Sequence, residues 1–517
     1  MSNDSTDWGN LLRRPMTRRD TLRLAGAGVI GGTMGPTFSR AAEPPTIGVT
    51  RPQAAVDLAY QTVAQAAELI RTKQLTSLEL TQACLDRIDR YAKPTFAFIT
   101  ITRDLALSQA RVADAEIARG NYRGVWHGIP IVLKDLIGTK GILTTAGTGA
   151  LEDWVPSEDA TAWAKLKAAG AVLLGNTNLH ELAAGFSNVN PFYGTTRNPW
   201  SPGLNHITGG SSGGNGVAIA SGMALAGVGS DTGGSIRVPS AMCGVTGLKP
   251  THGRVSTFNC IYLSWTLDHL GPMARSVEDA ALMMNVIAGF DPKDPISAAE
   301  PTEDYTADLA KGVRGLKLAM PMAATFWGYA QLQPEIAATV RKAIDVLKDL
   351  GASVSEVTIP GIEQALAGSI FNIEQAYHLQ DLLKVRPEKF SPGILASRTT
   401  ALQATAVDYM RSLRNIAETR TLLEDGLASY DAYVLPTVPI FPSVIDPAST
   451  TGIGQFTSPI NRSGQPALTV PAGFGSNGFP IGMMIVARRF NEKMVLRIGH
   501  AYQQATDWHT RRPPLAA

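Results

Sequence analysis

The stretch from Thr208 to Arg237 constrains this chain more than any other part of it. It reads TGGSSGGNGVAIASGMALAGVGSDTGGSIR and holds two Gly-Gly-Ser elements, which end at Ser211 and Ser235. Between them, residues 217–226 are small and apolar, which predicts a buried helix. The flanking glycines allow the backbone to approach another group closely or to adopt a positive φ. A buried segment with a serine on a glycine hinge at each end indicates nucleophilic chemistry, for which the chain must also supply a base.

The bulk properties are typical of a soluble globular protein with a large core. The chain has 517 residues, a formal net charge of +2 and 44% hydrophobic residues. A balance so close to neutral gives no reason to expect a nucleic acid or an acidic lipid as a partner. No apolar run reaches the length of about 18 residues that a membrane helix needs, so we expect no stable membrane span.

The cysteines and histidines do not indicate a disulfide framework or a metal site. Cys84, Cys243 and Cys260 are odd in number and form no C-x-x-C pair, which favours three free, buried thiols. Cys243 and Cys260 could still pair in an oxidising compartment. Five scattered histidines lack metal-ligand spacing and are interpreted as structural: His127, His180, His206, His252 and His269.

Residues 1–42 resemble an export signal of the twin-arginine type. The paired arginines lie in TRRDTLR (17–23), a weakly hydrophobic segment rich in glycine and alanine follows from Leu24, and Ser39–Ala41 suits a signal peptidase. A Pro-rich linker, residues 43–54, comes next. The pattern predicts export to the periplasm or the extracellular space, and the alternative is a disordered basic tail.

The rest of the chain, residues 55–510, is predicted to form one large α/β domain. Helix and strand patterns intermingle and no internal repeat appears, which favours a single core over several independent domains. A capping box, TSLE, predicts that a helix begins at Thr76. An apolar, strand-like run ends in Lys134, where a buried lysine without a partner would be unusual. The alternative is a lysine whose ammonium reaches solvent at the end of the strand.

Two common serine-hydrolase arrangements do not fit this sequence. Residues 209–213 match the G-x-S-x-G nucleophile elbow, but an elbow follows an apolar strand and residues 201–207 are loop-like. No serine has a lysine three residues later, which excludes a Ser-x-x-Lys site. A Ser–Ser–Lys arrangement remains.

Four long stretches resemble the amidase signature family. They are GIPIVLKD (128–135), ITGGSSGGNGVAIA (207–220), GSDTGGSIRVPSAMCGVTGLKPTHGRVS (229–256) and LDHLGPMARSVEDA (267–280). The likeness covers most of residues 55–290 and a short C-terminal part. It implies a mixed central β-sheet covered by α-helices on both sides, in a single large domain.

The resemblance also implies a role for each site residue. Ser235 would be the nucleophile, Ser211 the bridging serine after a cis peptide bond, and Lys134 the base. A lysine acts as a base only when neutral, so its pKa must fall from about 10.4 through burial or nearby positive charge. The backbone N–H groups of Thr232, Gly233, Gly234 and Ser235 would form the oxyanion hole. The supporting residues would be Asp231, Arg237 and Ser212.

The implied reaction is hydrolysis of a C–N amide bond in a small molecule through an acyl-enzyme, with no cofactor and no metal. Esters or carbamates could be accepted too, and a homodimer stays open. One alternative is a glutaminase-type subunit of a tRNA amidotransferase, which would work in the cytoplasm with a partner protein. Another is a non-catalytic binding protein on the same fold. The pocket that selects the substrate is expected within residues 186–193, 260–265 and 320–460.

Overall fold

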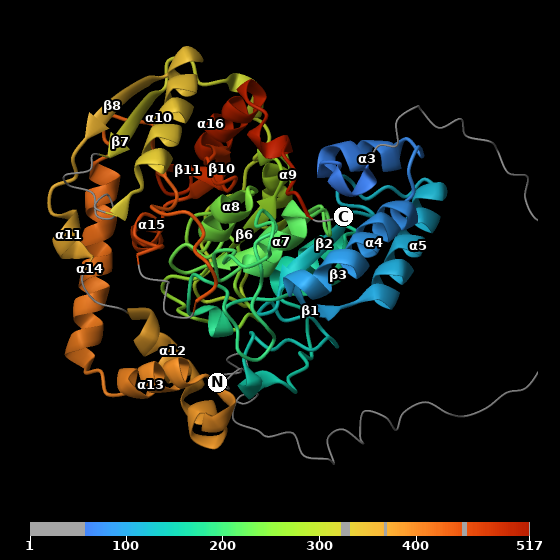
Figure 1. The fold of residues 1–517 in the computed structure, drawn as a ribbon, viewed down its shortest axis with the longest axis horizontal. Coiled ribbons are helices and arrows are strands. Elements are labelled where there is room, and N and C mark those ends of the chain that lie inside the picture. The colour runs from blue at the N-terminus through green and yellow to red at the C-terminus, as the bar shows by residue number, and fades with distance from the viewer. Residues whose placement is uncertain (1–56, 322–330, 367–369, 447–451, 516–517) are drawn as a thin grey trace, which may run out of the picture. The chain divides into compact units, whose positions relative to one another are not determined.

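The computed structural model describes residues 57–321, 331–366, 370–446 and 452–515. From Leu58 onward the chain forms one compact unit (Figure 1). The predicted signal and linker, residues 1–54, lie outside the described residues.

Eleven strands of the described residues form one mixed sheet. They are β1 (Phe98–Ile101), β2 (Pro130–Lys134), β3 (Val172–Thr177), β4 (Ala226–Asp231), β5 (Thr246–Lys249), β6 (His269–Ala274), β7 (Lys317–Pro321), β8 (Ser353–Val357), β9 (Ala432–Pro436), β10 (Ala467–Phe474) and β11 (Pro480–Ala487). Their order across the sheet is β1-β3-β2-β4-β6-β5-β10-β11-β9-β7-β8. Strand β2 runs parallel to β3 and β4, whereas β10 runs antiparallel to both β5 and β11.

Helices cover both faces of this sheet. They are α3 (Val63–Arg71), α4 (Ser77–Thr95), α5 (Arg103–Ala118), α6 (Thr161–Ala168), α7 (Gly213–Ala220), α8 (Arg237–Cys243), α9 (Val277–Ile287), α10 (Pro334–Asp349), α11 (Ile362–Ala365), α12 (Ile370–Val385), α13 (Pro392–Ala401), α14 (Ala406–Asp425), α15 (Ser458–Ser463) and α16 (Glu492–Ala505). Neighbouring residues on a strand point to opposite faces. On β10, Leu468 lies against Gly499 of α16, whereas Ala467 belongs to a buried cluster with Ile460 of α15. The predicted fold class is therefore confirmed.

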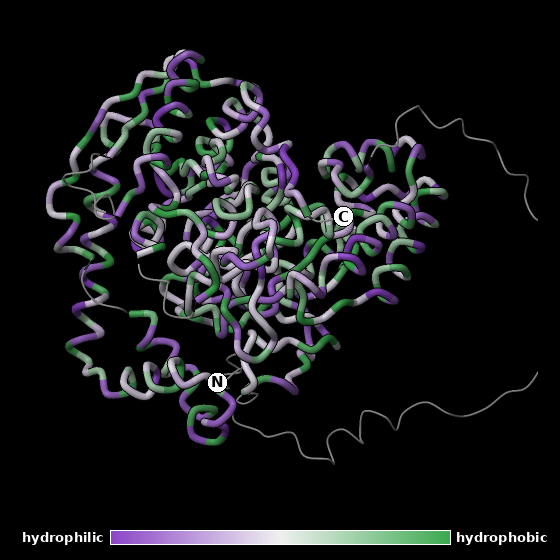
Figure 2. The backbone as a smooth tube through the Cα atoms, in the orientation of Figure 1, coloured by the Kyte–Doolittle hydropathy of each residue, from purple (hydrophilic) through white to green (hydrophobic). Residues whose placement is uncertain are grey.

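The sequence pattern explains which strands lie at the centre. Strands β2 and β4 are buried along their whole length and read as nearly continuous apolar or small runs, which is typical of parallel strands covered on both faces. The edge strand β8, by contrast, carries exposed polar side chains. Figure 2 shows hydrophilic and hydrophobic residues alternating along the outer helices.

The register of the central strands brings together the loop that follows β2 and the loop that follows β4. Leu133 of β2 pairs with Val228 of β4 in a parallel arrangement. The carboxyl ends of both strands therefore lie at the same edge of the sheet. That edge holds Lys134, the last residue of β2, and Asp231, the last residue of β4.

The predicted helix boundaries are confirmed at Thr76 and wrong at residues 217–226. The Thr76 side chain accepts the Glu79 N–H, and the Glu79 carboxylate accepts the Thr76 N–H, as a capping box requires. Helix α7, however, runs over Gly213–Ala220, and residues from Ala226 onward form strand β4. Gly222, with a φ of 68°, lies in the turn that separates them. The glycines that open α7 have low intrinsic helix propensity, so tertiary burial rather than local preference forms this helix.

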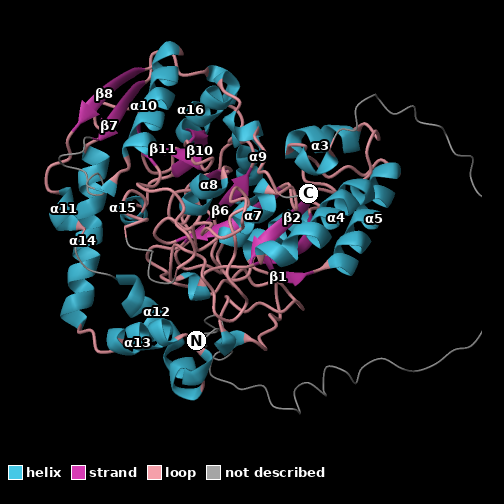
Figure 3. Ribbon diagram, in the orientation of Figure 1, coloured by secondary structure: helices cyan, strands magenta, loops and turns pink. Residues whose placement is uncertain are grey.

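Helices α12, α13 and α14 form a helical layer outside the sheet. Helix α12 packs against both α13 and α14. Figure 3 shows long loops between the central strands and these helices. Glu374 and Gln375 of α12 are buried, and the Gln375 side chain reaches Leu182 and Tyr262 in those loops.

Candidate active site

Lys134 is completely buried and donates hydrogen bonds to two serines. Its Nζ lies 2.6 Å from Ser211 Oγ and 2.9 Å from Ser230 Oγ. Burial lowers the pKa of the Lys134 ammonium to about 7, and the negative charges of Asp268 and Asp231 partly oppose that effect. The alternative of a solvent-reaching lysine is thereby removed, and the neutral amine is accessible near neutral pH.

Ser211 follows a cis peptide bond and sits directly before helix α7. The Gly210–Ser211 bond is the non-proline cis bond that the resemblance implies. The Ser211 carbonyl accepts the His180 N–H at 3.2 Å, so both the side chain and the main chain of this serine are held.

Ser235 lies in the turn between β4 and α8, next to Ser212. The Ser235 carbonyl accepts the Ser212 N–H at 3.1 Å, and the Ser212 hydroxyl donates to the Ser230 carbonyl at 3.2 Å. Ser212 therefore ties the two glycine-rich segments together, the supporting position that the resemblance implies. Within the described residues, no hydrogen bond joins the Ser235 hydroxyl to the Ser211 hydroxyl.

The turn from Thr232 to Ser235 is held by its carbonyl groups and leaves its N–H groups free. The Gly233 carbonyl accepts the hydroxyls of Thr457 and Ser458 at 2.6 and 3.0 Å, and the Gly234 carbonyl accepts the Val238 N–H at 2.7 Å. In the described part of the chain, none of the four N–H groups donates a hydrogen bond. An oxyanion hole needs such preorganised, unoccupied donors.

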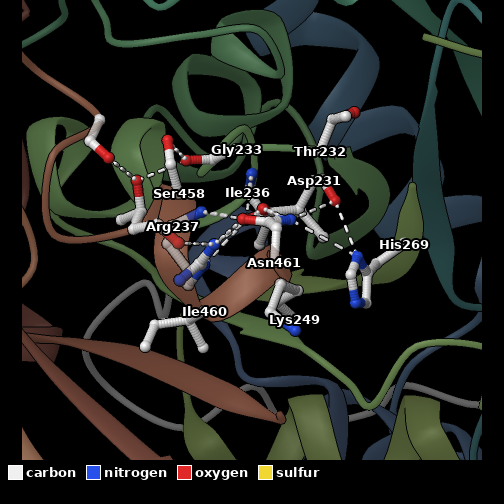
Figure 4. A network of polar contacts seen from close by, with 12 residues as sticks. Asp231, Thr232, Gly233, Ile236, Arg237, Lys249, His269, Ser458, Ile460 and Asn461 are labelled. Atoms are coloured by element: carbon white, nitrogen blue, oxygen red, sulfur yellow. Dashed lines mark hydrogen bonds and ion pairs between the residues drawn. The ribbon is translucent and has the colours of Figure 1, made fainter. Parts of the chain in front are cut away.

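A buried ion pair between Asp231 and Arg237 anchors this turn (Figure 4). Arg237 Nε and Nη2 donate to the two Asp231 carboxylate oxygens at 3.0 and 2.9 Å, and both side chains are fully buried. Burial alone would raise the pKa of Asp231, but the Arg237 charge and its hydrogen bonds hold that pKa well below its usual range. The carboxylate therefore stays ionised and also accepts the Ile236 N–H at 3.1 Å, which fixes the start of α8.

Two residues of this network were not predicted from the sequence. Asn461 of α15 donates to the Asp231 carboxylate at 2.8 Å and to the Asp231 carbonyl at 2.9 Å. Lys249, at the end of β5, is fully buried and donates to the Gln465 carbonyl at 2.5 Å. The signal that singled out Lys134, an apolar strand that ends in lysine, was present at Lys249 as well. No sequence signal links Asn461 to Asp231, because the two meet only through tertiary packing.

A small cavity lined by polar and apolar side chains lies beside Ser230, one of the two serines that Lys134 contacts. Its polar lining includes Ser230, Thr232, Thr257 and Asp268, and its walls include Ala183 and Tyr262. Residues 260–263 line it, whereas no residue of the predicted ranges 186–193 and 320–460 does. The Thr232 hydroxyl donates to Asp268, and burial raises the pKa of the Asp268 carboxyl to about 7. Asp268 was not predicted, since its sequence context gave no sign of burial.

The cysteines and histidines make contacts that fit structural roles. All three cysteines are free and buried. His127 pairs with Glu116 at 3.0 Å, whereas the rings of His252 and His269 pack 5.2 Å apart. Among the described residues, no group of histidines, cysteines or carboxylates could hold a metal ion. No helix within those residues is apolar and long enough to cross a membrane.

Comparisons with known proteins identify relatives of the same family and fold. The Amidase family model matches residues 79–496. A glutamyl-tRNA(Gln) amidotransferase subunit of Roseiflexus sp. strain RS-1 is 40% identical over 88% of this chain and 98% of its own length. A bacterial aryl acylamidase of the amidase signature family superposes with a TM-score of 0.79 at 28% identity, covering 87% of this chain and 97% of its own. The 6-aminohexanoate cyclic dimer hydrolase gives a TM-score of 0.81 at 27% identity, covering 89% of this chain and 100% of its own.

Proposed function

This chain belongs to the amidase family, whose enzymes act on C–N bonds, and from that premise we propose that Ser235, Ser211 and Lys134 hydrolyse the amide bond of a small molecule. One observation carries the proposal: the buried Lys134 Nζ lies 2.6 Å from the Ser211 hydroxyl. That contact pairs a serine with a base whose pKa of about 7 makes it effective at neutral pH. A non-catalytic binding protein has no need of such a pair.

The proposed first half-reaction moves one proton along the three side chains. Neutral Lys134 takes the Ser211 hydroxyl proton while Ser211 takes the Ser235 proton, and Ser235 Oγ attacks the substrate carbonyl carbon. The oxygen of the tetrahedral intermediate gains a negative charge, which the free N–H groups of residues 232–235 stabilise. Catalytic contacts often shorten only when substrate binds, so the two serine hydroxyls are expected to come into hydrogen bond distance at that point.

Departure of the amine completes this first half-reaction, and hydrolysis of the acyl-enzyme is the second. As the C–N bond breaks, the relay runs in reverse and protonates the leaving nitrogen, which departs as ammonia or an amine. The acyl group stays on Ser235 Oγ as an ester. A water molecule then gives one proton to the same relay and attacks this ester, which releases the carboxylic acid and restores the Ser235 hydroxyl. Esters and carbamates would follow the same steps.

A glutaminase-type subunit of a tRNA amidotransferase is the second candidate. The Roseiflexus relative, 40% identical over 98% of its length, is named as part of such an amidotransferase, and this supports the candidate. The signal-like residues 1–42 favour the first candidate, because an exported chain would be separated from cytoplasmic tRNA.

Hydrolysis by the purified single chain tests the proposal and separates the two candidates. The panel holds aliphatic amides, anilides, peptide amides, carbamates and glutamine, with amine or ammonia release as the readout. We expect release from a non-glutamine amide by the chain alone, loss of release in Ser235→Ala, and retention in the surface control Ser429→Ala. Activity in Ser235→Ala would contradict the mechanism. Hydrolysis confined to glutamine, and gained only with partner proteins, would favour the amidotransferase.

We also propose that residues 1–42 direct export through a twin-arginine pathway. The full chain, expressed in a bacterium, is fractionated and the N-terminal mass of each fraction is measured. A periplasmic protein that begins near residue 42 is expected. Full-length protein confined to the cytoplasm, with residue 1 intact, would refute export without touching the hydrolase proposal.

A further inference from the structure

Each free N–H group of the turn Thr232–Ser235 belongs to a peptide unit whose other end is the carbonyl of the preceding residue. The peptide bonds of this turn are trans. In a trans peptide the C=O and the N–H lie in one plane and point in opposite directions, so an anchored carbonyl fixes the direction of the N–H that follows it. The groups that bind these carbonyls therefore decide where the proposed oxyanion donors point.

Two hydroxyls at the start of α15 anchor the carbonyl of Gly233. Thr457 Oγ1 and Ser458 Oγ both donate to it, at 2.6 and 3.0 Å (Figure 4). A carbonyl oxygen has two lone pairs, so the two hydroxyls fill both acceptor positions. The peptide plane between Gly233 and Gly234 is then fixed, and the Gly234 N–H points away from α15.

A third side chain of α15 anchors the carbonyl at the start of the turn. Asn461 Nδ2 donates to the Asp231 carbonyl at 2.9 Å, and His269 Nδ1 lies 3.0 Å from the same oxygen. The Thr232 N–H belongs to this peptide unit and is directed away from both side chains. Asn461 Oδ1 accepts Arg237 Nη2 at 2.6 Å, so the amide cannot reverse without losing that bond.

The other two peptide units of the turn do not depend on α15. The Gly234 carbonyl accepts the Val238 N–H of α8 at 2.7 Å, which sets the direction of the Ser235 N–H. The Thr232 carbonyl accepts no hydrogen bond within the described residues. Helix α15 therefore directs two of the four N–H groups.

The start of α15 is packed firmly enough to act as a support. Phe456 and Ile460 are buried in one core cluster with Leu423 of α14 and Met484 of β11. Thr457 has no exposed surface. The donors at the start of α15 thus keep a fixed position relative to the sheet.

We propose that Thr457, Ser458 and Asn461 are positioning residues that align two oxyanion donors of the turn. The proposal rests on the proposed amide hydrolysis at Ser235. The three side chains act through the peptide units and not on the substrate itself. Hydrogen bonds to a carbonyl also polarise its peptide unit, which makes the N–H a stronger donor. Their effect should fall on the transition state rather than on the bound substrate, because the oxygen charge develops only there.

The central variant is Thr457→Val, which nearly keeps the shape of the side chain and removes the hydroxyl. Thr457→Ser, which keeps the hydroxyl, is the conservative rescue. The matched control is Thr419→Val on α14, because Thr419 is equally buried and donates to the Ala365 and Asn415 carbonyls instead of to the turn. Ser458→Ala, at a half-buried position, tests the same Gly233 carbonyl if Thr457→Val does not fold.

Steady-state hydrolysis of the best substrate of the panel is measured together with inhibition by the trifluoromethyl ketone that carries the same acyl group. The Ser235 oxygen adds reversibly to such a ketone and gives an oxyanion without a leaving group. Thr457→Val and Ser458→Ala should each lower kcat by about tenfold with little change in KM, and the double variant by about a hundredfold, as when one oxyanion donor is lost. Ki for the ketone should rise in proportion to the loss of kcat/KM. Thr457→Ser should recover most of the activity, and Thr419→Val should match the parent chain.

Two results would overturn the positioning role. One is a kcat equal to that of the parent chain in both Thr457→Val and Ser458→Ala. The other is a loss of activity without a matching rise in the Ki of the ketone, which would mean that the start of α15 merely supports the fold. Failure of the proposed hydrolysis itself would look different, because the parent chain would then neither turn over a substrate of the panel nor bind the ketone.

Discussion

At the scale of single residues, the chemistry depends on how Lys134 is buried. Its ammonium has no exposed surface, and its hydrogen bonds go to two neutral hydroxyls rather than to a carboxylate. Uncompensated burial favours the neutral amine, whereas the nearby charges of Asp268 and Asp231 favour the ammonium. The balance leaves the pKa of Lys134 near 7, so a modest change in pH converts it between acid and base.

The pH dependence of kcat/KM follows from that balance. The base must be neutral, and the pKa of Lys134 is lowered to about 7, so activity should rise with pH through that value and level off above it. Below the transition, kcat/KM should fall about tenfold per pH unit. The measurement is kcat/KM for one uncharged amide from pH 5 to 9, with the melting temperature recorded at each pH. An activity that rises toward acid, in protein that stays folded, would exclude Lys134 as the base.

At the scale of structural elements, the turn between β4 and α8 is anchored on several sides. Its carbonyls accept hydrogen bonds from α15 and α8 and from Thr457 before α15, the Asp231 carboxylate pairs with Arg237, and within the described residues its four N–H groups donate no hydrogen bond. Gly234 adopts a φ of 141°, and a Cβ there would come within 2.2 Å of the Thr457 hydroxyl that anchors the turn. A Cβ on Gly233 would come to 3.2 Å from the Ser458 hydroxyl, a tight contact that a small shift of that side chain would relieve.

These two adjacent glycines provide a matched pair of variants. Gly234→Ala should displace the turn and lower kcat by about 10²–10³-fold, the range measured when one oxyanion donor is lost. Gly233→Ala should cost much less, because the flexible Ser458 side chain can give way. Steady-state kinetics of both variants, with circular dichroism as the folding control, make the comparison. Equal losses in the two variants would contradict the geometry of the turn.

At the scale of the whole molecule, the sequence specified the chemistry better than the boundaries of the elements. Lys134 could be assigned only through the resemblance to the amidase signature family, because an apolar strand that ends in lysine also describes Lys249, whereas the glycine-rich serines marked the two loops from the sequence itself. Helix α7 was misplaced because its glycines weaken the local helix signal, which burial overrides. Asn461 and Gln375 could not be found, since each joins segments more than a hundred residues away in sequence. Such contacts exist only once the sheet and its helices have assembled.

The compact unit that begins at Leu58 contains every residue of the candidate site. A chain that starts at residue 57 should therefore keep its melting temperature and its hydrolytic activity. The comparison with the full chain uses differential scanning calorimetry and one amide substrate. A large loss of stability or turnover in the shorter chain would mean that residues before Asp57 contribute to the folded enzyme.

The most direct test of the central claim is to locate the acyl-accepting serine by mass spectrometry after fluorophosphonate labelling. Trypsin leaves Ser211 and Ser235 in a single peptide, residues 198–237, so fragment ions must separate the two serines. The mechanism predicts one adduct, on Ser235, with labelling that slows sharply in Lys134→Ala and in Ser211→Ala. An adduct on Ser211, or no adduct on the folded protein, would contradict it.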